Sequence, residues 1–277
     1  MRMGRVRRLW FRAGGVLLLL FASASGAADR GADGQFEERH SSHFVLYQDV
    51  DIDETSGFHG SRRFEQRVLE VLESAYQNLD RQLGLRPEQP ITVVVYDPQV
   101  FDQQFMGLFR FSAAGFYAGR VHIRGGVTMS SSLSRVLHHE LVHAALDQEM
   151  GAAHVPAWFN EGIAEWFEAR SAGKRRLSAQ ERVFLQRATR QGSLFSLEQL
   201  SSPTFGGFGP GAAQLAYVES YGFVAYLAHH HSENRIRDWV REVVRTRDLD
   251  RATRRSFRTD LPRLEERYFK ELAQGGP

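Results

Sequence analysis

Three residues near the middle of the chain have the types and the spacing of a metal site. They are His139, Glu140 and His143, which together form the pattern H-E-x-x-H. On an α-helix, residues four positions apart lie on one face, so the two imidazoles could bind the same tetrahedral zinc ion. Glu140 lies beside that face, where it could take a proton from a water molecule at the metal without binding the metal itself. The spacing therefore predicts a zinc site with a general base next to it.

The neighbouring residues predict the helix that would carry this motif. A serine run at 130–132 could cap its N-terminus, and the helix is expected to end near Gly151. Apolar residues recur between these points at helical spacing, at Leu133, Val136, Leu137, Leu141, Ala144 and Ala145. His138 lies about 100° away from the ligand face, so we expect a surface or hydrogen-bonded core histidine there. Because H-E-x-x-H alone is only moderately specific, the zinc interpretation needs a further ligand.

A second motif supplies that candidate ligand. Seventeen residues separate His143 from Glu161, which lies in a predicted helix over 156–166 with proline in its first turn. This separation lets the first helix end and the second return antiparallel, which would bring Glu161 to the same zinc and leave the fourth position for water. Glu165 lies one turn further on the same face, where it could orient a ligating histidine, although an exposed carboxylate is the alternative. His154 lies in the connection and could line the cleft.

With both motifs present, the chain resembles the gluzincin zinc peptidases, and most closely the peptidase MA-like domain. That family combines H-E-x-x-H with a downstream W-x-x-E-G-x-A-E, which is present here as Trp158, Glu161, Gly162, Ala164 and Glu165. A weaker likeness extends from about Phe44 to about Leu227. The resemblance implies a zincin-like fold with one zinc ion per chain at the junction of two lobes. It also implies hydrolysis of a peptide or protein substrate.

The resemblance further implies a donor for the oxyanion that develops during peptide hydrolysis. In aminopeptidases of the same clan, a tyrosine on a comparably placed helix has this role, and the alignment favours Tyr217, with Tyr221 one turn later as the alternative. Either tyrosine could instead be part of the core. Those aminopeptidases also carry a glutamate that holds the free amine of the substrate, on the strand before the metal helix. The corresponding stretch, Gly115–Arg124, has no acidic residue, which favours an endopeptidase over an aminopeptidase.

The N-terminal segment predicts export. Residues 1–28 contain five arginines, then an apolar run over 13–22 and small residues, which is typical of a secretory signal peptide cleaved between Ala24 and Asp29. The run is too short to span a bilayer, and the chain has no cysteine for a lipid anchor, so we expect a periplasmic or secreted product without a stable membrane anchor. Removing this segment changes the formal charge from +2 to −3, which gives no support for nucleic-acid binding.

Patterns along the rest of the chain predict an α+β fold with a mixed sheet. We expect a flexible leader over 29–42, an N-terminal α+β lobe with the H-E-x-x-H helix over 43–150, and a mainly helical C-terminal lobe with the third-ligand helix over 151–277. The β-branched run 90–96 is the clearest strand, and 116–124 has the pattern of another. Helical patterns in the second half cover residues 178–190, 195–201, 212–230, 233–246 and 260–274.

Two other functions remain open on the sequence. One is a zinc amidase that acts on cell-wall peptides, and the other is a zinc-stabilised periplasmic binding or assembly factor. The intact Glu140 argues against the binding factor, because a purely structural zinc site has no need of a general base.

Overall fold

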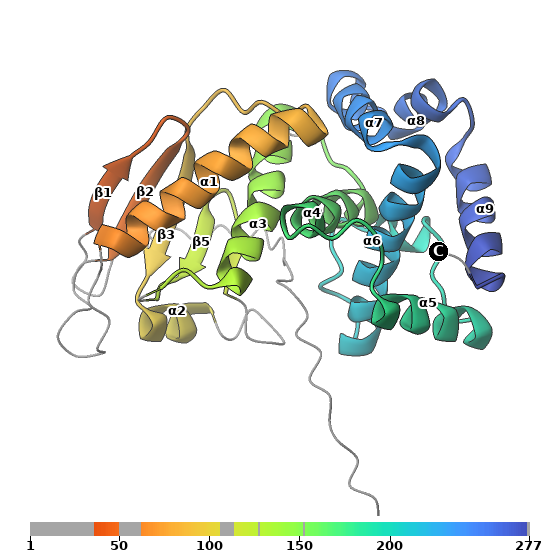
Figure 1. The fold of residues 1–277 in the computed structure, drawn as a ribbon, viewed down its shortest axis with the longest axis horizontal. Helices are drawn as coiled ribbons and strands as arrows, with labels where there is room; N and C mark the ends of the chain where they lie inside the picture. The colour runs from red at the N-terminus through yellow and green to blue at the C-terminus, as the bar shows by residue number, and fades with distance from the viewer. Residues whose placement is uncertain (1–35, 50–61, 106–113, 127, 152, 276–277) are drawn as a thin grey trace, which may run out of the picture.

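A sheet and a set of helices occupy opposite ends of the molecule, with the helix α4 (Ala157–Ser171) between them (Figure 1). The structure is a computed structural model that describes residues 36–49, 62–105, 114–126, 128–151 and 153–275. The predicted signal peptide, residues 1–28, lies outside the described residues. The sheet is mixed and the C-terminal part is helical, so the predicted α+β class is confirmed.

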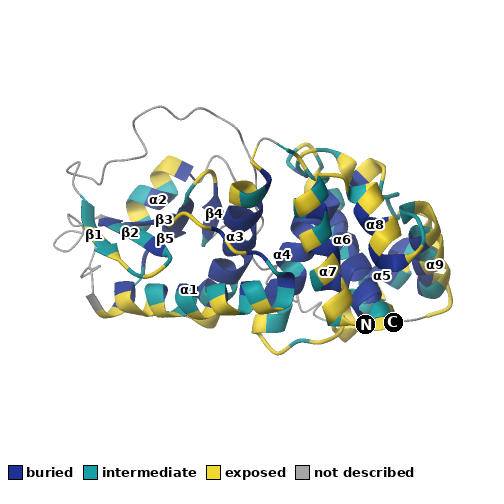
Figure 2. Cartoon of the chain, turned by 90° about the horizontal axis from the view of Figure 1, so that it is seen from above, coloured by how far each residue is buried: buried dark blue, intermediate teal, exposed yellow. Residues whose placement is uncertain are grey.

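The described residues form a five-stranded sheet in the order β1-β2-β3-β5-β4. Its strands are β1 (Phe36–His40), β2 (Phe44–Asp49), β3 (Ile91–Tyr96), β4 (Gly115–Tyr117) and β5 (Val121–Arg124). The inner pairs β2–β3 and β3–β5 are parallel, whereas β1 and β4 run antiparallel to their neighbours. Parallel strands require crossover connections, and helices α1 (Arg62–Leu83) and α2 (Pro98–Phe105) lie on opposite sides of the sheet (Figure 2). The central strand β3 is therefore almost entirely buried, as its β-branched run predicts.

The strand β1 corrects the prediction of a flexible leader over 29–42. Phe36–His40 pairs along its whole length with β2, while residues 29–35 lie outside the described part of the chain. The Phe36 ring packs edge-on against Tyr47 at 6.4 Å and Tyr96 at 6.2 Å between centroids, and Arg39 forms an ion pair with the buried Glu65. The strand could not be predicted from its polar composition, because it is held mainly by backbone hydrogen bonds to β2 and by the contacts of one aromatic side chain.

The segment 116–124, predicted as one strand, is a hairpin of two. Gly119 lies in the turn between β4 and β5 with φ of +71°, a conformation that glycine adopts without a steric penalty. The backbone N–H of Ala118 donates to the carbonyl of Arg120 at 2.9 Å and closes the turn. This reversal makes β4 the last strand of the described sheet and brings it against the helix that carries H-E-x-x-H.

The C-terminal half of the described chain is built from five further helices, of which α6 packs along α4. They are α5 (Ala179–Gln191), α6 (Pro210–His231), α7 (Glu233–Thr246), α8 (Leu249–Phe257) and α9 (Leu261–Ala273). Helix α8 was not predicted, and within 195–201 the structure has only a short 3-10 helix, Gln199–Ser201. The fully buried Trp158 of α4 stacks on Trp239 of α7, with 6.2 Å between the ring centroids. This contact joins α4 to the helical half. No helix among the described residues is long and apolar enough to cross a membrane.

Candidate metal centre

Helix α3 (Ser131–Met150) carries the H-E-x-x-H motif and has the predicted ends. The Ser130 hydroxyl accepts a hydrogen bond from the Leu133 N–H at 3.0 Å, and Gly151 ends the helix with φ of +59°. The helix packs against α1, α4 and β4. Because neighbours cover it on several sides, its motif residues are buried rather than exposed: His139, Glu140 and His143.

Helix α4 brings the third candidate ligand to the two histidines. Pro156 was predicted within its first turn and lies one position before its first residue, and the helix packs against both α3 and α6. The Glu161 Oε2 atom lies 3.4 Å from Nε2 of His139 and 3.5 Å from Nε2 of His143. Two helices therefore place three potential ligand atoms within 4.8 Å of one another, in the combination that the sequence predicts.

The hydrogen bonding of these atoms fits a bound divalent metal ion. Both Nε2 atoms, Oε2 of Glu161 and both carboxylate oxygens of Glu140 are buried without a hydrogen-bond partner in the described part of the chain. An unsatisfied buried polar group costs about 1–3 kcal/mol, so a cluster of them indicates a missing partner. Two imidazoles and one carboxylate are a common ligand set for catalytic zinc, which leaves further coordination positions open.

The charges around the cluster also favour a cation. Burial in an acidic neighbourhood raises the pKa of Glu140 to about 7. Burial alone would lower the pKa of His139, but the nearby carboxylates of Glu161 and Glu168 outweigh it and hold that pKa well above its ordinary value. Several buried carboxylates thus surround two imidazoles, and a positive ion would balance them.

Side chains of α4 contact the other ring nitrogens of the two histidines. Nδ1 of His139 lies 3.3 Å from Oε2 of Glu168, and Nδ1 of His143 donates to Oδ1 of Asn160 at 3.0 Å. Arg135 in turn donates to the Glu168 carboxylate at 2.7 Å. Such contacts fix the ring orientation and the tautomer of a ligating histidine, here with Nε2 towards Glu161.

Neither Asn160 nor Glu168 was predicted, although Glu168 could have been found from its spacing. It lies seven residues after Glu161, two helical turns along the same face. Glu165, which was predicted to orient a ligating histidine, is partly buried and belongs to a group of potential ligand atoms with His139 and Glu168. Burial and the charge of Glu168 raise the pKa of Glu165 to about 8. The 3.3 Å contact with the imidazole is made by Glu168.

Two histidines close to the motif lie outside the cluster. His138 is buried, and its Nδ1 donates to the backbone carbonyl of Ser134 at 2.7 Å, which is the hydrogen-bonded core histidine expected at that position. His154 is exposed and lines a cavity beside His143. The cleft position considered for His154 from the sequence therefore agrees with the structure.

Both candidate tyrosines are buried on α6 but have different electrostatic neighbours. Burial, together with the charges of Glu161, Glu165 and Glu140, holds the pKa of Tyr217 well above its ordinary value. Burial and the charge of Glu181 raise the pKa of Tyr221, and the Lys174 ammonium lies 4.5 Å from its ring centroid. The charges of the candidate ligand and of the candidate base thus act on Tyr217 rather than on Tyr221.

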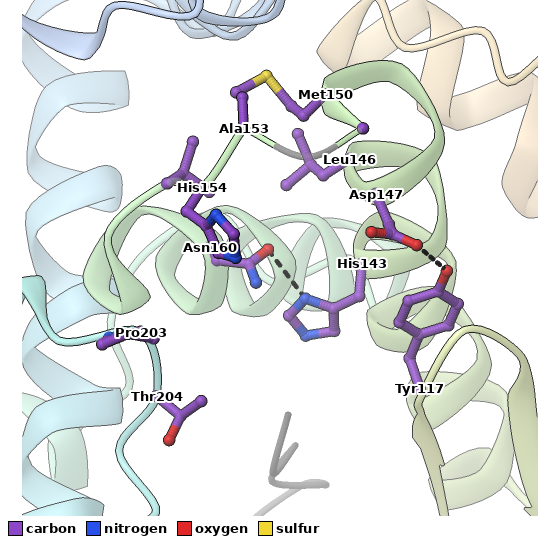
Figure 3. A pocket seen from close by; sticks show the side chains of 12 residues that line it. Tyr117, His143, Leu146, Asp147, Met150, Ala153, His154, Asn160, Pro203 and Thr204 are labelled. Atoms are coloured by element: carbon purple, nitrogen blue, oxygen red, sulfur yellow. Dashed lines mark hydrogen bonds between the residues drawn. The ribbon is translucent and has the colours of Figure 1, made fainter. Parts of the chain in front are cut away.

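A cavity of about 260 Å³ adjoins the cluster at the C-terminal end of α3 (Figure 3). Helix α3, strand β4, the connection to α4 and the segment 203–204 contribute to its lining. His143 and Asn160 face it, so the cavity and the candidate metal ligands share a wall. This places a space for part of a substrate next to the cluster.

An α+β fold in which two packed helices supply H-E-x-x-H and a distant glutamate is typical of zincin-like metalloproteins. The model of the peptidase MA superfamily matches residues 72–274, well over half of the chain. The chain belongs to this superfamily, and membership indicates a metallopeptidase. The match continues through α9, further than the likeness seen in the sequence alone. No curated protein matches the chain.

Proposed function

We propose that the protein is an exported, zinc-dependent endopeptidase. The observation that carries this proposal is the convergence of His139, His143 and Glu161, with the Glu140 carboxylate buried beside them and without a hydrogen-bond partner among the described residues. A zinc ion held by these three residues would supply an activated water and polarise the scissile carbonyl.

Two further side chains have roles in the proposed reaction. Glu140 takes the proton of the attacking water and passes it to the leaving amine, and its free oxygens leave it available for that transfer. The Tyr217 hydroxyl donates to the oxyanion that develops on the carbonyl. Support for Tyr217 comes from its place on α6, which packs on the ligand-bearing α4, and from the charges of Glu161 and Glu140 that act on it.

Cleavage within a chain is favoured by the strand beside the site. β4 ends the described sheet next to α3, so an extended peptide could pair with its backbone. Neither β4 nor β5 carries an acidic residue that would hold a free N-terminal amine there. Export is supported by the arginines and the apolar run within residues 1–28.

A comparison of the wild type with Glu140→Gln tests the proposal. Both proteins should contain about one zinc ion per chain, because Glu140 is not a ligand. A digest of a peptide library should show internal cleavage by the wild type and a loss of at least about 10²-fold in Glu140→Gln, since the amide cannot accept the proton. Mass spectrometry of the exported protein should place its N-terminus between residues 25 and 29.

The control is Glu88→Gln, which removes an exposed carboxylate away from the cluster and should retain full activity. Equal cleavage by the wild type and Glu140→Gln would exclude Glu140 as the base. Bound zinc without cleavage of any peptide would favour a binding or assembly factor instead.

A further inference from the structure

The cavity beside His143 carries an acidic group that the proposed reaction does not use. Asp147 lies one helical turn after His143 on α3 and faces the cavity (Figure 3). Among the described lining residues, Asp147 is the only acidic one, and none is a lysine or an arginine. Within the described chain, Asp147 also has no basic side chain in ion-pair contact. Asp147 therefore gives the cavity a negative charge that no lysine or arginine among the described residues neutralises.

A neighbouring strand holds this carboxylate in place. The Tyr117 hydroxyl, on β4, donates to Oδ2 of Asp147 at 2.6 Å. Burial and this hydrogen bond raise the pKa of Tyr117, so the hydroxyl remains a donor. No hydrogen bond to Oδ1 is formed within the described part of the chain, so this oxygen is available to another donor. An acidic residue in the last turn of a helix is also disfavoured by the helix dipole, so the position of Asp147 does not serve the stability of α3.

Apart from its histidine, asparagine and threonine side chains, the remaining lining suits an aliphatic chain. Leu146 and Met150 project from α3, and Val155 and Pro203 complete an apolar surface. A volume of about 260 Å³ lies below the roughly 300–1,000 Å³ that is usual for whole small-molecule ligands, so a single side chain is the better fit. Lysine and arginine combine an aliphatic stem with a cationic end, which matches apolar walls that carry one fixed carboxylate.

We propose that this cavity binds the lysine or arginine side chain of a peptide substrate, with the stem against Leu146 and Met150 and the cation on Asp147. The proposal rests on the proposed function, because His143 lines the same cavity and the bound side chain would lie close to the scissile bond. A free N-terminal amine offers the same charge. The apolar walls favour a side chain, and the experiment separates the two sources.

The test measures binding independently of cleavage. Zinc-loaded Glu140→Gln is titrated with acetylated, amidated peptides in which each position carries either lysine or norleucine, so that the charge of one side chain is the difference. At one position, the lysine peptide should bind at least about tenfold more tightly. Adding Asp147→Asn should abolish this preference, whereas adding Glu88→Gln should leave it intact. Asp147 is exposed, so Asp147→Asn should fold normally, which thermal denaturation checks.

The other outcomes are equally informative. Equal binding of lysine and norleucine peptides, absence of binding by both, or a lysine preference that survives Asp147→Asn would overturn the proposal. Tighter binding of a norleucine peptide with a free N-terminal amine than of the acetylated lysine peptide would assign Asp147 to the substrate N-terminus and overturn it too. Tyr117→Phe keeps the charge but releases the carboxylate, so it should weaken the preference only in part. Cleavage by the wild type is scored separately: a lysine preference in binding without any cleavage would contradict the proposed peptidase function alone.

Discussion

At the scale of single residues, the orientation of the imidazoles distinguishes the two candidate ligands from the adjacent His138. Glu168 faces Nδ1 of His139, and Asn160 accepts from Nδ1 of His143, so each ring turns Nε2 towards Glu161. His138 has the same ring, but its Nδ1 is bonded to the backbone of its own helix. Helix α4 thus carries one candidate ligand and contacts the two others, so the geometry of the candidate site depends on its position.

The first prediction at this scale concerns Tyr217. If its hydroxyl donates to the oxyanion, Tyr217→Phe should lower kcat by about 10²–10³-fold, the usual cost of losing one such donor. KM should change little, because the hydrogen bond forms mainly in the transition state. Zinc content should stay the same. Steady-state kinetics on a cleaved peptide, together with metal analysis, measures each of these quantities.

Tyr221→Phe is the matched control for this prediction. Tyr221 lies one turn later on α6, is equally buried, and packs under Lys174. Its variant should keep kcat. A loss of kcat only in Tyr221→Phe would transfer the role to that residue, and normal turnover in both variants would assign both tyrosines to the core.

The sequence was sufficient for the candidate ligands but not for their supporting contacts. H-E-x-x-H and the later glutamate act through fixed helical spacing, so His139, His143 and Glu161 could be identified from residue types alone. The contacts of Asn160 and Glu168 depend on how α4 crosses α3, and side-chain packing decides that crossing. For the same reason, helical spacing predicted Glu165 as the residue that orients a ligating histidine, whereas in the structure Glu168 makes the direct contact with Nδ1 of His139.

At the scale of elements, the close approach of α4 to α6 determines where Glu161, the third candidate ligand, lies relative to the two histidines. Gly162 follows Glu161 directly, and a Cβ atom built on it would lie 2.7 Å from the Ser220 carbonyl oxygen and 3.0 Å from a methyl group of Val224. A backbone carbonyl inside a helix cannot rotate away, so any side chain at position 162 must push the helices apart. The glycine of the second motif is therefore a packing requirement.

Gly162→Ala tests this requirement. Overpacking of this kind typically costs about 1–3 kcal/mol, and we expect a decrease of that size in the free energy of unfolding. A shift of α4 would also move Glu161 relative to the histidines, so zinc affinity should fall. Urea denaturation and competition with a chelator measure the two effects. Gly211→Ala is the control, because nothing lies within 4 Å of a Cβ at this helical position. A wild-type stability and zinc affinity in Gly162→Ala would contradict the packing argument.

Elements with strong patterns were predictable, and elements defined by their partners were not. The helix over 233–246 and the run over 90–96 carry their own periodicity and recur as α7 and β3. By contrast, β1 has a single aromatic residue and depends on pairing with β2. The hairpin of β4 and β5 depends on one glycine with a positive φ, which has no signature in hydrophobic periodicity.

At the scale of the whole molecule, a buried acid joins two segments of the helical half and makes its stability depend on pH. Glu219 of α6 is buried, and its carboxylate accepts from the Phe195 N–H at 3.1 and 3.2 Å. Burial raises the pKa of Glu219 to about 8, with a smaller contribution from Glu265. The folded state therefore prefers the protonated acid, whereas the unfolded chain ionises near the ordinary value of 4.5.

The sign of this effect follows from the two pKa values. Below about pH 4.5 both states are protonated, so Glu219 has no effect on the pH dependence. Between pH 4.5 and 8 the unfolded state loses its proton first, and stability falls as the pH rises through this window. Glu219→Gln removes the titration and keeps one acceptor for the Phe195 N–H. At pH 8.5 the shift from 4.5 to about 8 corresponds to at most about 5 kcal/mol, at about 1.4 kcal/mol per pKa unit. The buried amide of the variant offsets part of this gain, so the variant should exceed the wild type by about 1–3 kcal/mol.

Urea denaturation of both proteins at pH 5 and pH 8.5, with a chelator present throughout, measures the difference. The chelator removes metal binding as a second source of pH dependence. The gain in the free energy of unfolding should be small at pH 5 and largest at pH 8.5. Glu198→Gln, which removes an exposed charge from the neighbouring segment, should leave the stability nearly unchanged at both values. A gain for Glu219→Gln that is the same at both pH values would show that lost repulsion or altered packing, rather than the proton held by the buried acid, determines the contribution of this site.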